Sequence, residues 1–325
     1  MKIAHVADNL LKLEVKKNDP LDVGSEWEDE RTILGQIDAL EDAGHTVVRL
    51  DFDDTLIENL LAEKPDCVFN ISEGKTGKDR ESLVPAICKF LKIPCTSSDA
   101  VGMGISLDKV LCKIIAKQQN IPTARWLVAD NTKDLNDSDL QYPLFVKPVF
   151  EGSSMGIRPE SLVKDKKHLK TQTSWLTKNI GPALIEEYLS GRELTVGLIG
   201  NNEPEAFPVA EIKTGDKIYD KSMKGKDSMD EEVICPAPID AEIEKQLISW
   251  SKTLFKIMGL SGLARFDYKC DRDGQPQFME ANPLPGLSKF YSVFTIQASV
   301  AGLSYNEMIA KLVSLALKKA ESEKV

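Results

Sequence analysis

The 325-residue sequence contains no apolar run near the ~20 residues that a transmembrane helix needs. Its first residues, MKIAHVADNLLKLEV, also lack the apolar stretch and the small-residue cleavage site of a secretory signal. These two absences lead us to expect a cytoplasmic protein without a membrane partner.

Dense clusters of lysine and arginine are also missing, and the formal net charge is -10 at pH 7. This charge would repel a nucleic-acid backbone, so we expect no nucleic-acid partner. The six cysteines are scattered, without the paired spacing of a zinc site or the density of a disulfide-linked secreted domain. We expect them to be reduced residues of the core.

The chain is long enough for two or three compact lobes around a cleft, and it shows no internal repeat or low-complexity tract. In the first hundred residues, short apolar runs alternate with helical apolar spacing, which predicts a small lobe with a parallel sheet. Strands are expected over 3–7, 46–52, 67–71 and 93–96, and helices over 27–43 and 55–64.

The pattern changes from residue 98 onward. Helices are expected over 107–119 and 165–178, and strands over 124–129, 144–149 and 183–188. Antiparallel strands followed by two helices, over 242–258 and 304–320, are expected in the last third. The sequence therefore predicts a mixed α/β protein with three lobes, 1–97, 98–183 and 184–325.

The clearest candidate site is a predicted β-hairpin over residues 263–282. Its strands carry polar side chains at alternate positions: Arg265, Asp267, Glu280 and Asn282. If the two faces coincide, the carboxylates meet and need a cation, because unpaired buried charges cost several kcal/mol. Mg²⁺, with Mn²⁺ as an alternative, suits such oxygen ligands. A polar face turned to solvent is the other interpretation, although the rigid loop 283–286 favours the first by directing the strand end into a cleft.

A second candidate combines Lys147, near the end of a predicted strand, with the glycine- and serine-rich segment 151–156. The lysine would supply a point charge for phosphate, and the loop would supply backbone and hydroxyl donors. Taken alone, a glycine- and serine-rich turn is more often only a turn, and a single strand lysine is usually solvated, but their adjacency favours a phosphate site.

A third candidate is the acidic segment 186–193. Carboxylates beside an exposed strand can accept hydrogen bonds from an adenine amine and from ribose hydroxyls. A charged edge strand is the alternative interpretation.

Together these elements have the order and spacing of the ATP-grasp superfamily, and from about residue 93 to residue 317 the chain resembles the D-alanine–D-alanine ligase family. The resemblance implies an ATP-grasp fold with an N-terminal parallel α/β lobe, a central lobe and a C-terminal antiparallel-sheet lobe. It also implies a homodimer formed through the N-terminal lobe.

The resemblance implies roles for individual residues. Those expected to bind ATP are Lys109, Lys147, Glu151, Ser153, Ser154, Glu186, Glu187, Leu189, Glu193 and Lys224. Those expected to take part in the reaction are Arg265, Ser153, Lys224 and the backbone of Gly286. The expected Mg²⁺ ligands are Asp267, Glu280 and Asn282. The loops 151–156 and 216–230 are expected to close over the reactants and exclude water.

The chain departs from the family pattern where amino acids are recognised. The His-Gly-Gly segment is absent, and Glu73 and Arg80 lie in its place as expected substrate contacts. Tyr291 and Ser292 replace a serine-leucine pair, and Gly225 replaces a tyrosine. Three candidates remain for the family's N-terminal glutamate: Glu26, Glu28 and Glu30.

The implied reaction is ATP-dependent joining of a carboxylate to an amine through an acylphosphate. Our leading hypothesis is a D-alanine–D-alanine ligase that makes a dipeptide for the cell wall. The same chemistry on other amino acids or on a peptide end is the alternative. A nucleotide-binding regulatory protein without turnover is a third hypothesis.

Overall fold

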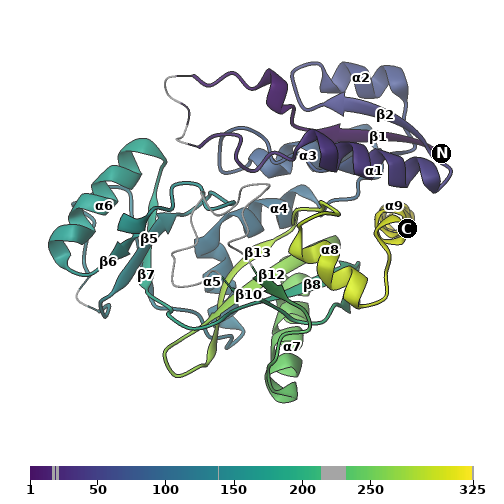
Figure 1. Cartoon of the computed structure of the whole chain (residues 1–325). Helices are drawn as coiled ribbons and strands as arrows, with labels where there is room; N and C mark the ends of the chain where they lie inside the picture. Colours follow the sequence, from purple (N-terminus) through teal and green to yellow (C-terminus); the bar gives the residue numbers. More distant parts are fainter. Residues whose placement is uncertain (17–18, 20–21, 138, 214–231, 324–325) are drawn as a thin grey trace.

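Three β-sheets organise the part of the chain that the computed structural model describes, residues 1–16, 19, 22–137, 139–213 and 232–323. Figure 1 shows them as an N-terminal lobe, a smaller lobe beside it and a larger sheet below, with the helices packed around them. No helix among these residues is long and apolar enough to cross a membrane.

The N-terminal sheet is parallel, with the strand order β2-β1-β3. Its strands are β1 (Lys2–Ala7), β2 (Thr46–Asp51) and β3 (Cys67–Asn70). The helices of this lobe are α1 (Glu30–Asp42), α2 (Leu56–Glu63) and α3 (Leu83–Leu91), and short 3-10 turns form η1 (Leu10–Lys12) and η2 (Arg80–Ser82). Parallel strands need such helical crossovers, which is why apolar runs and helical patterns alternate in this part of the sequence.

The second sheet is antiparallel, with the order β4-β7-β5-β6. It contains β4 (Trp126–Ala129), β5 (Leu144–Pro148), β6 (Leu162–Val163) and β7 (Ala183–Glu187), with η3 (Pro159–Ser161) before β6. Helix α6 (Lys166–Asn179) covers it and buries Leu169 and Leu176 against the sheet residues Leu144, Val146 and Ile185.

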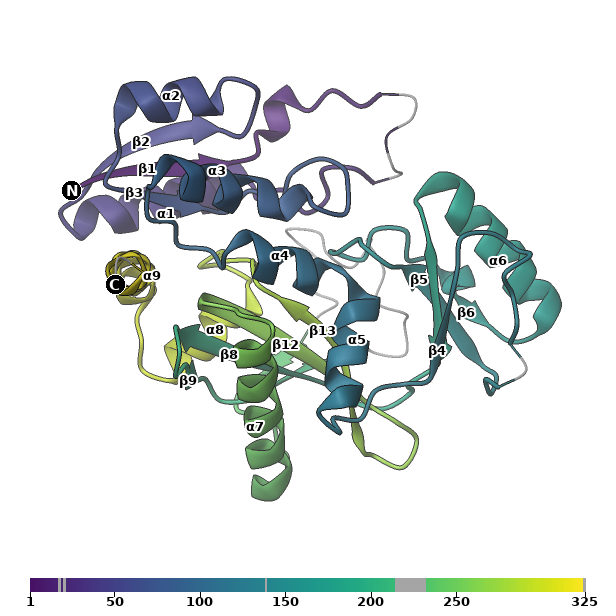
Figure 2. The same cartoon turned by 180° about the vertical axis from the view of Figure 1, so that it is seen from behind.

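The third sheet has six strands, in the order β11-β10-β8-β12-β13 with β9 paired to β8. They are β8 (Glu193–Gly200), β9 (Glu205–Ala206), β10 (Ala210–Lys213), β11 (Glu232–Ile234), β12 (Gly262–Cys270) and β13 (Pro276–Asn282). Helices α5 (Lys109–Gln118) and α7 (Ala241–Ile257) pack on one face, as Figure 2 shows from behind.

The C-terminal helices join the large sheet to the N-terminal lobe. Helix α8 (Val293–Val300) packs on β8, and α9 (Tyr305–Ser322) packs against α1 and β3. One continuous core contains Phe69 of the N-terminal sheet, Leu263 of β12 and Leu312 of α9. This core therefore joins the first and last thirds of the chain.

Several sequence-based boundaries are wrong. The helix expected over 27–43 begins only at Glu30, because the Asp29 side chain caps it by accepting from the Thr32 amide. The helix expected over 107–119 is broken at Asp108, which ends α4 (Ala100–Leu107) and caps α5. The strand expected over 93–96 is reduced to one bridge between Cys95 and Val68. Helices α3, α4 and α8 were not predicted.

Candidate active site

The β12–β13 hairpin brings the predicted polar side chains to one face. Arg265 lies opposite Asn282, and Asp267 lies opposite Glu280, before a register shift that follows Asp267. Cross-strand neighbours in an antiparallel pair share a face of the sheet. The expectation that these side chains converge is confirmed, and the solvent-facing alternative is wrong, because all of them line a cavity of about 740 Å³.

Asp267 is the most strongly engaged of these groups. Its carboxylate accepts hydrogen bonds from Arg265 Nε at 2.9 Å and Nη2 at 2.7 Å, from Asn282 Nδ2 at 2.8 Å and from Thr195 Oγ1 at 2.6 Å. These bonds fix the carboxylate and leave its side chain only 6 % exposed. Thr195, on the neighbouring strand β8, was not predicted to take part.

Lys109, on α5, approaches the hairpin. Lys109 Nζ lies 3.3 Å from Glu280 Oε2 and donates to the Glu151 carbonyl at 2.6 Å. Burial opposes the ionisation of Glu280, but Lys109, Lys147 and Arg265 outweigh it and lower its pKa to about 2. The carboxylate therefore stays charged at neutral pH.

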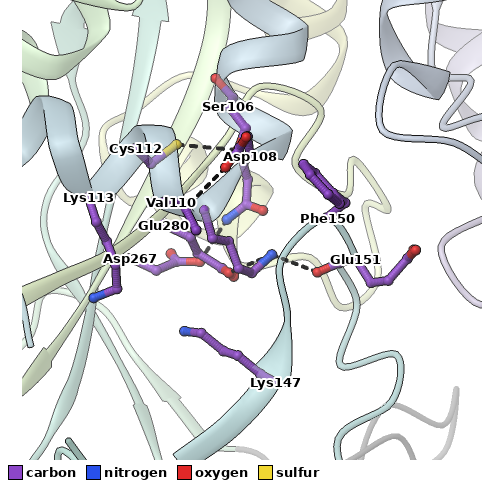
Figure 3. A network of polar contacts seen from close by, with 12 residues as sticks. Ser106, Asp108, Val110, Cys112, Lys113, Lys147, Phe150, Glu151, Asp267 and Glu280 are labelled. Carbon is purple, nitrogen blue, oxygen red and sulfur yellow. Dashed lines mark hydrogen bonds and ion pairs between the residues drawn. The ribbon is translucent and has the colours of Figure 1, made fainter. Parts of the chain in front are cut away.

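Glu186 of β7 holds the other two lysines of the site. Its carboxylate oxygens lie 2.9 Å from Lys113 Nζ and 2.7 Å from Lys147 Nζ, and all three side chains are buried. Burial opposes the charge of Glu186, but the two ammonium groups prevail and lower its pKa to about 2. In Figure 3, Lys113, Lys147, Asp267 and Glu280 approach a common region from different elements. A contact of Glu186 with adenine remains a prediction.

The sequence reasoning gave no role to Lys113. Residues four apart lie on the same face of a helix, so the pair Lys109 and Lys113 was the signal that could have indicated it.

The segment 151–156 forms a turn that lines the cavity. Ser153 and Ser154 both have positive φ, 45° and 59°, which non-glycine residues adopt at a cost. Met155 N donates to the Gly152 carbonyl at 2.9 Å, and Ile157 N donates to the Ser154 carbonyl at 3.0 Å. This strained turn lines the same cavity as Lys147, and its role as a phosphate-binding loop stays a prediction.

The segment between β7 and β8 lines the far end of the cavity with Glu187, Leu189 and Glu193. Glu193 lies 3.0 Å from Lys269 Nζ, and Glu187 accepts from the Gln141 amide at 2.9 Å. Their proposed contacts with adenine and ribose are predictions.

The opposite end of the cavity is lined by Glu26, Glu28 and Glu73, and by Gly286, Tyr291 and Ser292. Glu30 does not line it, which leaves Glu26 and Glu28 as candidates for the N-terminal glutamate. Ser292 Oγ accepts from the Ser288 amide at 2.9 Å, so it shapes the loop before α8.

Arg80 differs from its expected role, because it lies behind the cavity wall with a side chain only 1 % exposed. Its guanidinium holds Glu26 at 2.7 Å and the Phe150 carbonyl at 2.9 Å. We therefore describe it as a residue that positions the wall. Lys224, Gly225 and the loop 216–230 lie outside the described residues.

Comparison with known proteins agrees with this geometry. The model of the D-ala D-ala ligase C-terminus matches residues 115–314, more than half of the chain. The D-alanine–D-alanine ligase of Aquifex aeolicus is 33% identical over 277 residues, covering 85% of this chain and 91% of the relative. The chain belongs to the D-alanine–D-alanine ligase family.

Two further comparisons show how much of the chain is shared. An uncharacterised protein of Sinorhizobium fredii, y4sG, is 31% identical over 90% of this chain and 89% of its own length. The crystal structure of the Bacillus anthracis D-alanine–D-alanine ligase complexed with ATP superposes with a TM-score of 0.78, covering 99% of both chains at 23% identity. The predicted ATP-grasp fold is confirmed.

Proposed function

We propose that this chain is an ATP-dependent ligase that joins the carboxylate of one amino acid to the amine of another through an acylphosphate. The observation that carries the proposal is the convergence, in one cavity, of the two lysines Lys109 and Lys147 with the hairpin residues Arg265, Asp267 and Glu280. Family membership makes this chemistry the expected one.

The proposed reaction has two steps. A carboxylate oxygen attacks the γ-phosphorus of ATP and the bond to ADP breaks, which gives an acylphosphate. An amine then attacks the acyl carbon, phosphate leaves with the bonding electrons, and the amine loses a proton. No side chain has to act as a nucleophile.

Charge neutralisation is the main task of the protein in both steps. Lys109 and Lys147 lie where they can neutralise a triphosphate, while Lys113 holds Glu186 in place. Arg265, fixed by two bonds to Asp267, would stabilise the negative oxygen that develops during amine attack, and the backbone of Gly286 would assist it. Removing such a donor typically costs about 3 kcal/mol of transition-state stabilisation.

The residues of the hairpin fit a magnesium ion. Asp267, Glu280 and Asn282 offer two carboxylates and an amide oxygen on neighbouring strands, which is the hard oxygen set that Mg²⁺ prefers. When bound, the ion would polarise phosphate oxygens and offset their charge. We propose these residues as its ligands.

The choice of amino acids is the less defined part of the proposal. D-Alanine is the first candidate because relatives carry that name. Other amino acids or a peptide end form the second candidate, which is favoured by Tyr291, Ser292 and the many carboxylates at the substrate end of the cavity. We retain the cytoplasmic location and a homodimer as predictions.

The decisive experiment is phosphate and ADP release from ATP with Mg²⁺, measured across a panel of D- and L-amino acids. The proposal expects release that depends on an amino acid, together with dipeptide detected by mass spectrometry. Nucleotide binding without release in any mixture would instead support the regulatory hypothesis.

A further inference from the structure

The substrate end of the cavity has a wall of carboxylates, of which only Glu151 is expected to contact the nucleotide. We call it the acidic wall and define it as Glu26, Glu73, Glu81 and Glu151, all of which line the cavity. One carboxylate oxygen from each of Glu26, Glu73 and Glu81 lies within 4.8 Å of the others. Three negative groups from different segments thus meet at one point.

Arg80 compensates only part of this charge. Its Nη2 lies 2.7 Å from Glu26, 3.5 Å from Glu151 and 3.8 Å from Glu81. No described residue forms an ion pair with Glu73. Lys109 acts electrostatically on Glu81 and Glu151 and partly offsets the rise that burial causes in the pKa of both carboxyls, but its ammonium group is bound by Glu280 and by the Glu151 carbonyl.

Glu81 is the clearest sign of a missing partner. Its side chain is only 6 % exposed, yet no described donor lies within hydrogen-bonding distance of its carboxylate except the Glu73 carboxyl. A contact between two carboxyls requires a shared proton. Burial raises the pKa of Glu81 to about 7, even though Arg80 and Lys109 act in the opposite direction. Burial, followed by Glu81 and Glu26, likewise raises the pKa of Glu73.

The charges of the acidic wall do not balance. Four carboxylates face one guanidinium, and a proton shared between Glu73 and Glu81 still leaves two negative charges. The α-ammonium of an ordinary amino acid would neutralise one of them. Its carboxylate belongs at the other side of the cavity, near Arg265, where the reaction takes place.

We propose that one of the two amino-acid substrates is a diamino acid, and that Glu73 and Glu81 bind the ammonium group of its side chain. This inference rests on the proposed ligase function and names its substrate class. An ammonium that donates three tetrahedral hydrogen bonds of about 2.8 Å holds its acceptors about 4.6 Å apart. The oxygens of Glu26, Glu73 and Glu81 lie within 4.8 Å of one another, and the ammonium would take the place of the proton that Glu73 and Glu81 share.

A divalent cation is the competing occupant of the acidic wall. Mg²⁺ binds oxygens at about 2.1 Å and would draw neighbouring ligands to about 3.0 Å from one another. The ammonium is the better candidate because the wall lies in the cavity that must receive amines.

The test compares diamino acids with uncharged analogues of similar length. Lysine, ornithine and 2,4-diaminobutyrate are each paired with norleucine, norvaline and 2-aminobutyrate, in both D and L forms. Each is assayed alone and together with D-alanine for amino-acid-dependent ADP release and for dipeptide mass. We expect kcat/KM for at least one diamino acid to exceed that of its analogue by about tenfold or more, the usual effect of a charged hydrogen bond.

Variants assign this preference to the acidic wall. Glu81→Gln and Glu73→Gln should each lower the ratio of kcat/KM between the diamino acid and its analogue by about tenfold. Glu41→Gln is the matched control, because Glu41 is exposed on α1 and outside the cavity, and it should leave the ratio unchanged. Since the ratio is measured within one protein, a partly unfolded preparation does not alter it.

The outcomes separate this inference from the function on which it rests. If no amino acid stimulates ADP release, the ligase function fails. If uncharged amino acids are ligated as well as or better than the diamino acids, the ligase function stands and the inference is wrong. The inference is also wrong if nucleotide-free protein binds Mn²⁺ at a site that Glu81→Gln abolishes, because the wall would then be a metal site.

Discussion

The ion pairs of Glu186 with two buried lysines should make a measurable contribution to the stability of the protein. Its carboxylate bridges Lys113 and Lys147, and Glu186→Gln would leave two buried ammonium groups without that charge. Breaking a buried pair by removing one partner costs about 3–5 kcal/mol. The lowering of the Glu186 pKa from 4.5 to about 2 gives a similar figure, about 3 kcal/mol at neutral pH.

Urea unfolding at pH 7, followed by circular dichroism, measures this difference. Glu187→Gln is the matched control on the same strand, because Glu187 pairs at 3.6 Å with the exposed Arg125 and such pairs contribute less than about 1 kcal/mol. MgATP should restore more stability to Glu186→Gln than to the native protein, since phosphate would supply the missing negative charge.

The pH dependence provides a second check. Because the folded-state pKa of Glu186 is depressed, its contribution is complete above the unfolded value of 4.5 and is lost as the pH falls toward 2. The difference between native protein and variant should therefore shrink between pH 5 and pH 2. Equal urea midpoints for the two proteins at pH 7 would refute the reasoning.

Three further predictions concern the hairpin, a buried histidine and a glycine. Asp267→Asn should lower kcat for ATP-dependent ligation by about 100-fold or more while the fold is kept, as judged by circular dichroism; native activity would contradict the site. Burial lowers the pKa of His5 from 6.5 to about 4, so its contribution to stability is complete above pH 6.5 and is lost as the pH falls through 4. His5→Gln should therefore flatten the stability profile over that range by up to about 3 kcal/mol, and an unchanged profile would exclude this cause. Gly262→Ala should lower the free energy of unfolding in urea by more than about 2 kcal/mol, because its methyl group would lie 2.4 Å from the Thr96 carbonyl oxygen. Gly274→Ala, with nothing within 4 Å of the added methyl group, should lower it by about 1 kcal/mol. Equal losses for the two variants would refute the clash.

The hairpin could be predicted from sequence because its information is local. Alternating polar positions around a short turn determine which side chains share a face, and the structure pairs Asp267 with Glu280 on that face. The strands of the N-terminal lobe were predicted for the same reason, since each is a short apolar run between helical patterns.

The three helices that were not predicted contain residues that are uncommon in helices. Helix α3 carries Pro85 in its first turn, where the absent N–H costs little, and α4 contains Gly102 and Gly104. Helix α8 begins with Val293 and is rich in residues that favour strands. Tertiary packing, rather than local propensity, determines that these three segments are helical.

The site residues that were missed depend on contacts between distant segments. Arg80 was expected to touch substrate, yet it reaches the Phe150 carbonyl from η2 and stays behind the cavity wall. Thr195 joins Asp267 only because β8 lies beside β12. A single sequence contains no local signal for either contact.

The two ends of the cavity differ in how their charges are balanced. At the phosphate end each carboxylate already has a cation: Glu280 has Lys109, Glu186 has Lys113 and Lys147, and Asp267 has Arg265. A triphosphate arriving with its metal ion can exchange partners with these pairs while the total charge stays balanced, so this end requires no particular amino acid.

The acidic wall has no such balance, since Arg80 serves Glu26, Glu81 and Glu151 together and Glu73 has no described cation. The compensating charge must arrive with the substrate or as protons. This difference explains why the nucleotide chemistry could be predicted from family motifs, whereas the identity of the amino acid depends on carboxylates that the motifs do not contain.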